Sequence, residues 1–215
     1  MAQDKLAESM FLLLHDPFSG RPEIAHELLN CALVAAELAE LIMTGHIGID
    51  NDRVVVIDSR DVGPDEMSAF VVDSIQSQPG AHTVRSWVEV LSDVLYEMVA
   101  RGMVEAGVVS REQGGRRLLR RSPDRFPSVD LLRASAPRVR LEHMLRVPDD
   151  MDQQGTVTAA ILGALDIVQG FDVGIDRIAL RGRISELTQQ LPSDLRDVVA
   201  GVEASAASIS LTVRR

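Results

Sequence analysis

The stretch that decides the fold class is residues 24–45, IAHELLNCALVAAELAELIMTG. Its large apolar side chains recur at alternating spacings of four and three residues, which is typical of one helix face. Alanines between them widen this face with small side chains, so a neighbouring helix can pack closely. Pro22 suits the first turn of a helix and Gly45 suits the stop after its last residue. We therefore predict a long core-facing helix whose apolar stripe is Ile24, Leu28, Cys31, Ala35, Leu38 and Ile42.

Helical patterns continue on both sides of this segment. The further expected helices are residues 5–15, 61–76, 83–106, 128–145, 150–169, 172–190 and 192 onward. One β-hairpin is expected at residues 46–58, because two β-branched runs flank Asn51-Asp52. A second hairpin, edged with arginine, is expected at residues 108–127, and Pro137, Pro148 and Pro192 should mark bends or helix boundaries. The predicted fold class is mainly α, a single globular helical domain over residues 1–215 with two β-hairpins.

Composition limits the class of protein. The chain has 215 residues, of which 46% are hydrophobic and 25% charged, as in ordinary soluble globular proteins. A single cysteine excludes a disulfide framework and a multi-cysteine zinc site. The start has no secretory signal, and the most apolar run, residues 28–43, is too short and too charged to cross a bilayer. We expect a cytoplasmic protein that, at most, rests on the cytoplasmic face of a membrane.

Charge is distributed unevenly along the chain. The net charge is −10, yet residues 111–146 hold ten arginines and four carboxylates, a local charge of +6 against −16 elsewhere. Arginine outnumbers lysine 21 to 1, which fits a GC-rich bacterial genome. Charges more than a Debye length of about 8 Å away are largely screened, so a local basic face can bind an anion on an acidic protein.

Five arginines are the candidate binding residues: Arg116, Arg117, Arg120, Arg121 and Arg125. If residues 116–121 alternate as one strand, both strand faces carry arginine, unlike a half-buried strand. Each guanidinium near an anionic lipid surface contributes about 1 kcal/mol, so four contribute roughly 4 kcal/mol. Two alternatives remain open: the arginines pair with acids of this or a neighbouring subunit, or they form a solvated edge that discourages strand aggregation.

Other polar motifs predict no catalytic or metal chemistry. Glu37 and Glu40 could hold a metal, but no Glu-x-x-His pattern accompanies them, so buried salt bridges or exposure to solvent are expected. Asp50-Asn51-Asp52 resembles the start of an EF-hand loop, but Val55 replaces the required glycine, so we interpret it as a hairpin turn. Cys31 is expected in the core. No nucleophile elbow, Walker loop or dinucleotide fingerprint occurs, and we expect no enzyme, metal or cofactor.

Four features in order along the chain resemble the Golgi phosphoprotein 3 family. They are the run Phe11–Asp16, the helix end and hairpin start Leu38–Ile47, Trp87 with Val90-Leu91, and Val104–Val109. They are similar, in turn, to the family's "LLL-x-D" start, its "LAEL" helix entering a hairpin, its "W-x-x-x-L" helix and its "hVEKGVL" element. The resemblance spans nearly the whole chain.

The resemblance implies a helical, non-catalytic protein with β-hairpins. Eukaryotic members bind phosphatidylinositol 4-phosphate through a tryptophan and a few arginines, and hold enzyme tails at the cytosolic face of the Golgi. Counted onto this sequence, those pocket positions are Ala25, Val34, Asp93 and Tyr96, so the specific pocket residues are not retained. A remodelled pocket for a different ligand is conceivable beside Tyr96, which we place on a wetter helix face than the core residue Trp87.

The resemblance also places the family's self-association hairpin at residues 115–127. Two functions are therefore carried forward. The first is a peripheral-membrane adaptor that binds anionic lipid head groups through the candidate arginines. The second is a cytosolic homo-oligomeric scaffold without lipid binding. Nucleic acid is not expected as a partner, because Glu37 and Glu40 lie on the helix that would enter a DNA groove and would be repelled by phosphate.

Overall fold

The computed structural model describes residues 5–60, 65–78, 82–117, 120–121, 123–171 and 173–213; the side chains of residues 116, 117, 120, 121, 169 and 210–213 lie outside the description. The described chain is mainly helical, as predicted. Helix α2 (His26–Met43) lies at the centre and is buried along most of its length. Four helices pack around it: α1 (Leu6–Leu13), α4 (Val84–Glu105), α6 (Gln153–Ala164) and α8 (Ser193–Val213).

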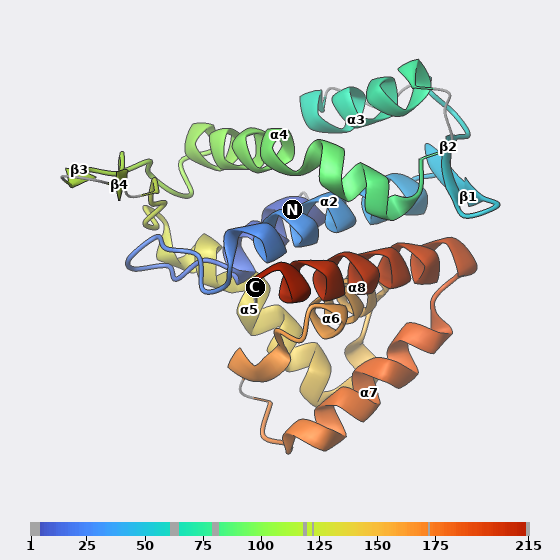
Figure 1. Cartoon of the computed structure of the whole chain (residues 1–215). Helices are drawn as coiled ribbons and strands as arrows, with labels where there is room; N and C mark the ends of the chain where they lie inside the picture. Colours follow the sequence, from blue (N-terminus) through green and yellow to red (C-terminus); the bar gives the residue numbers. More distant parts are fainter. Residues whose placement is uncertain are drawn as a thin grey trace.

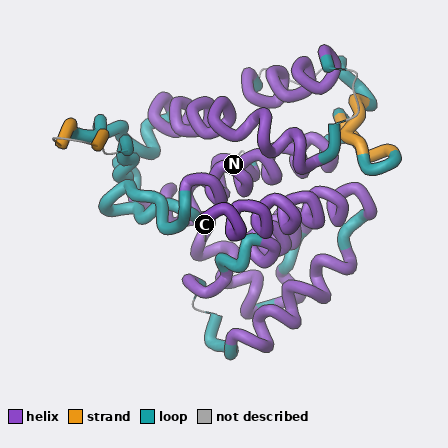
Figure 2. The backbone as a smooth tube through the Cα atoms, viewed as in Figure 1, coloured by secondary structure: helices purple, strands orange, loops and turns teal. Residues whose placement is uncertain are grey.

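Three further helices form an outer set. Helix α3 (Glu66–Ser77) packs on α4, α5 (Leu131–Arg146) on α1, and α7 (Arg177–Gln190) on α6. Short 3₁₀ turns, Pro148–Asp150 and Val168–Gly170, join the last helices. The two β-hairpins lie at opposite ends of the helical body (Figures 1 and 2). The first is formed by β1 (Ile47–Asp50) and β2 (Arg53–Val56).

Local chemistry explains where α2 and α4 end. Gly45 and Gly107 follow them with φ of 79° and 68°. The His46 N–H then donates to Leu41 O and the Val108 N–H to Met103 O, the six-to-one bonds of a Schellman motif. Carboxylates of Asp65, Asp130, Asp152 and Asp176 and the hydroxyl of Thr83 cap helix starts by accepting backbone N–H bonds.

The first hairpin forms as the sequence predicts. Asn51 and Asp52 have φ of 49° and 63°, the left-handed pair that a two-residue hairpin turn needs. Asp50 pairs with Arg53, so these residues close the strands and form no EF-hand loop.

The predicted start of the central helix is wrong. Pro22 lies before the helix, in an isolated bridge with His15, and the helix begins at His26. The chain first turns back on itself, because the Glu23 N–H donates to Leu14 O (2.9 Å) and the Asp16 N–H to Arg21 O (2.9 Å). The stripe residue Ile24 therefore lies outside the helix. Pro148 and Pro192 mark helix boundaries as expected, whereas Pro137 lies inside α5 and so is no boundary; the predicted alternative of a bend stays a prediction.

Candidate functional site

Described residues of the segment 109–128 pair as an antiparallel β-hairpin, and we call this segment the arginine arm. Its outer strands are β3 (Arg116–Arg117) and β4 (Arg120–Arg121), and Figure 1 shows both far from the helical body. Isolated bridges join Val109 to Ser128 and Glu112 to Arg125. These pairings share one register with β3 and β4, so all the described pairs belong to one hairpin.

The register brings like charges face to face. Arg116 lies directly opposite Arg121, and Arg117 directly opposite Arg120. The expectation that residues 116–121 form one alternating strand is therefore wrong, because Arg116–Arg117 and Arg120–Arg121 are two separate strands that pair antiparallel. Like charges directly opposite each other across a sheet destabilise it. The four side chains, together with residues 118 and 119, lie outside the described part of the structure, so their contact with an anion stays a prediction.

Most other arginines of the basic segment, residues 111–146, are neutralised within the protomer. Arg138 binds Glu23 (2.8 Å), Arg140 binds Asp152 (2.5 Å) and Arg146 lies 3.7 Å from Glu142. The pairing alternative is therefore correct for these side chains. The charge of +6 that the sequence assigns to the segment thus overstates the free positive charge on its described part.

Arg111 holds the base of the arm against α4. Its guanidinium contacts Asp124 (2.7 Å) on the arm and Glu97 (2.9 Å) on α4, and lies 5.6 Å from the centre of the Phe126 ring. The bonds to Asp124 and then Glu97 raise the pKa of Arg111 above its usual range. Asp124 also accepts the Gly114 N–H (3.0 Å). These contacts fix the base of the arm against α4.

A cavity of about 680 Å³ opens beside this base. Its lining comes from the loop before α2, from α4 and from the arm: Arg21, Pro22, Ile24, His26, Asp93, Tyr96, Glu97, Pro123, Asp124 and Arg125. Arg21 and the predicted residue Arg125 make no ion pair with any residue of the described chain. Asp93 accepts a hydrogen bond from the Asn30 amide (3.2 Å), and Arg111 holds the other two acids. The three carboxylates and the three arginines Arg21, Arg111 and Arg125 therefore place charges of both signs at the cavity and roughly balance.

Tyr96, which lines the cavity, belongs to a buried aromatic cluster with Phe11, His15 and Phe126. Tyr96 is 8% exposed, so placing it on a wetter face was wrong, although it does line the cavity. Burial, with Glu97 next in effect, raises the pKa of Tyr96 to about 12. His15 stacks 4.0 Å from the Phe11 ring and its Nδ1 lies 2.8 Å from Phe11 O. Burial lowers the pKa of His15 to about 4, so its ring is neutral at pH 7. This aromatic cluster is therefore uncharged at pH 7.

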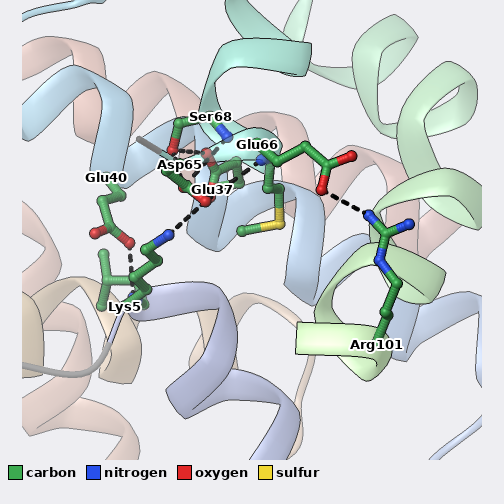
Figure 3. Close-up of polar contacts among 9 residues, drawn as sticks. Lys5, Glu37, Glu40, Asp65, Glu66, Ser68 and Arg101 are labelled. Atoms are coloured by element: carbon green, nitrogen blue, oxygen red, sulfur yellow. Dashed lines mark hydrogen bonds and ion pairs between the residues drawn. The ribbon is translucent and has the colours of Figure 1, made fainter. Parts of the chain in front are cut away.

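A second polar cluster joins α1, α2 and α3 at the other side of the core (Figure 3). Glu37 is fully buried and accepts a hydrogen bond from the Ser68 hydroxyl (2.7 Å), while its Oε2 has no partner. The Ser68 hydroxyl also lies 2.5 Å from Asp65, which pairs with Lys5 (2.5 Å). Burial raises the pKa of Glu37 to about 8, and neighbouring Glu40 and Asp65 add to this. Glu37 is thus a neutral acid at pH 7.

The expectation of a salt bridge or solvent exposure for Glu37 is therefore wrong. Glu40, one turn away, accepts the Leu6 N–H (2.7 Å) and caps the start of α1. Across the described residues, no three His, Cys, Asp or Glu side chains are placed to hold a metal ion. No helix within the described ranges is both long and apolar enough to span a bilayer.

The family of the chain follows from a comparison of its sequence. Residues 6–202 match the family described as Golgi phosphoprotein 3 (GPP34). The chain belongs to the Golgi phosphoprotein 3 family. A comparison with curated proteins finds no match. Membership points to a non-enzymatic adaptor.

Two of the four positions that the resemblance assigns to a lipid pocket line the cavity. Asp93 and Tyr96, which stand at two of the family's arginine positions, both line it, and Ala25 lies between the lining residues Ile24 and His26. Val34 is instead buried in the core. The two free arginines of the cavity, Arg21 and Arg125, come from other positions. The sequence analysis identified Arg125 because it belongs to a cluster of arginines, and it missed Arg21. The loop that carries Arg21 lies next to the arm only in the folded chain.

Proposed function

We propose that this Golgi phosphoprotein 3 family member is a non-enzymatic peripheral-membrane adaptor that binds anionic lipid through the arginine arm. The observation that carries the proposal is the register of β3 and β4, which sets Arg116 against Arg121 and Arg117 against Arg120. Such pairs repel each other until anions lie between or around them. A layer of anionic head groups supplies these anions.

The distance along the arm favours this function despite the acidic body. From the Glu112–Arg125 bridge to the Arg117–Arg120 pair the strands advance five residues, roughly 17 Å at about 3.4 Å per residue. That is about twice the Debye length at physiological salt, so acids at the arm base are largely screened at the tip. Four arginines then contribute roughly 4 kcal/mol of attraction to an anionic surface. Arg21 and Arg125 line the cavity at the arm base together with the carboxylates of Asp93, Glu97 and Asp124, so the attraction is assigned to the arm tip alone.

Liposome sedimentation tests the proposal. Vesicles of phosphatidylcholine with phosphatidylglycerol should retain the wild-type protein at low salt and release it at high salt. Arg120→Glu with Arg121→Glu removes about 2 kcal/mol of attraction and adds repulsion, so partitioning should fall by about 30-fold or more. The control is Arg177→Glu with Arg196→Glu, which makes the same charge change at two exposed arginines on α7 and α8. Absence of low-salt binding, or equal loss in both variants, would refute the proposal.

A homo-oligomeric scaffold is the second candidate. The observation that favours it is that β3 and β4 pair with each other while Figure 1 shows no described helix against them. A lone two-stranded hairpin is only marginally stable in water, so a neighbouring copy could cover it. Light scattering at micromolar concentration, with and without residues 115–126, distinguishes the two. An oligomer lost on deletion supports the scaffold, and a monomer in both cases counts against it.

A further inference from the structure

Large apolar side chains are exposed around the base of the arginine arm. Phe18 is 75% exposed on the loop between α1 and α2, and Leu132 is 82% exposed in the first turn of α5. Val129 and Leu131, beside Leu132, are also exposed. We call these four side chains the apolar rim. Soluble proteins scatter such residues singly, whereas a group of them on joined segments marks an interaction surface.

Main-chain hydrogen bonds hold the two segments of the rim together. The Ser128 N–H donates to Pro17 O (2.9 Å), and the Phe126 N–H donates to Gly20 O (2.8 Å). Gly20 permits this contact because it has φ of 64° and because a Cβ there would lie 2.1 Å from the Pro127 nitrogen. The loop that carries Phe18 is thus fixed to the strand that leads into α5. Exposure of Phe18 is built into the fold.

The surroundings of the rim indicate its partner. Arg21 follows the Phe18 loop and Arg125 precedes Val129, and both face the adjacent cavity without an ion pair in the described chain. The arm with its four arginines extends from the same end (Figure 1). Phe18 lies on a turn and Leu132 at the start of a helix, so the exposed side chains of the rim come from the ends of elements rather than from one flat face. Exposed apolar side chains next to arginines fit the interface of an anionic bilayer. The acyl chains contact the apolar side chains, and the anionic head groups bind the arginines.

We propose that the apolar rim inserts beneath the head groups of an anionic bilayer when the arginine arm binds it. The inference rests on the proposed function and adds to it a second, salt-insensitive component and a fixed orientation of the protein on the membrane. The arm supplies long-range attraction, and the rim supplies burial of apolar surface, which salt does not screen. The protein then meets the membrane with the arm, the α1–α2 loop and the start of α5.

A fluorescent probe at single cysteines tests insertion. Phe18→Cys and Leu132→Cys are labelled with an environment-sensitive nitrobenzoxadiazole group. Native Cys31 is fully buried and burial raises its pKa to about 12, so it should not react. The matched control is Ile178→Cys, because Ile178 is 84% exposed at the start of α7, away from the arm. Anionic vesicles should shift emission to the blue at positions 18 and 132 and leave position 178 unchanged.

Three results would overturn insertion. Sedimentation with anionic vesicles but no shift at positions 18 and 132 refutes insertion and leaves the proposed function standing. Absence of sedimentation refutes both. A blue shift of the emission that grows with protein concentration in the absence of vesicles would show that the rim contacts a second copy of the chain instead.

Partitioning of serine variants gives an independent readout. Burial of two large apolar side chains in the bilayer should raise the partition coefficient by more than a factor of ten. Phe18→Ser with Leu132→Ser should therefore weaken vesicle binding by at least about tenfold. The fold loss should be the same at low and at high salt, unlike that of Arg120→Glu with Arg121→Glu. Ile178→Ser should bind like wild type. Equal binding by the rim variant and wild type contradicts insertion.

Discussion

Replacing Glu37 by glutamine should remove a large pH dependence of stability. Burial holds the pKa of Glu37 at about 8 in the folded state, against an ordinary value of 4.5. The folded protein therefore keeps a proton that the unfolded chain releases, and the free energy of unfolding falls as pH rises from about 4.5 to about 8. At 1.36 kcal/mol per pKa unit the whole fall is about 5 kcal/mol, of which about 3 kcal/mol has occurred by pH 7. The total free energy of unfolding of a small domain is only about 5–15 kcal/mol.

Glutamine reproduces the neutral acid. Its carbonyl can accept the Ser68 hydroxyl bond that Glu37 Oε1 accepts now, and its amide takes the place of Oε2, which has no partner. Glu37→Gln should match wild type near pH 5 and exceed it by roughly 3 kcal/mol at pH 7. Urea unfolding from pH 5 to pH 9 measures this difference. The control is Glu203→Gln, an exposed carboxylate on α8. Parallel pH profiles for wild type and Glu37→Gln would show that Glu37 is ionised in the folded protein.

Two further predictions concern the opposite side of the core and the base of the arm. His15, whose pKa burial lowers to about 4, should cause stability to fall as pH drops from 6.5 through 4, by about 3 kcal/mol in total. In the same urea unfolding series, His15→Gln should reduce the loss of stability between pH 6.5 and pH 4. An unchanged loss would contradict a buried, neutral His15. Gly20→Ala places a Cβ against the Pro127 backbone at φ of 64° and should cost at least about 2 kcal/mol, read as a lower thermal midpoint. Gly115→Ala meets open space without a positive φ and should cost far less; equal losses would show that the Gly20 contact is not tight.

The presence of the central helix and its C-terminal end could be predicted from the sequence for local reasons. The apolar pattern predicts a core helix, but the predicted single buried stripe is wrong, because every residue from Leu29 to Ala39 is buried. Gly45 supplies the left-handed residue that ends the helix. Asn51 and Asp52 likewise form the first hairpin turn through their own conformational preferences. The start of α2 could not be predicted in this way. Pro22 suits a helix start, but main-chain bonds between residues 14–16 and 21–23 take precedence.

The candidate site was predictable only in part, because it depends on contacts between distant segments. Charge clustering located the arm and Arg125, but a single alternating strand was the wrong geometry, since residues 117 and 120 lie on two strands that pair antiparallel. The cavity joins residues 21–26, 93–97 and 123–125, which no spacing rule connects. Glu37 resembled a surface or salt-bridged carboxylate, and only its burial beside Ser68 shows that it is neutral.

One titration tests most directly whether the arm is a lipid-binding element. Partition coefficients onto phosphatidylglycerol-containing vesicles are measured over a range of salt for wild type and for a variant with glutamine at positions 116, 117, 120 and 121. Our account predicts that wild-type affinity falls steeply with salt and that the glutamine variant binds weakly with a shallow dependence. Two coincident salt curves, or no wild-type binding at the lowest salt, would contradict it.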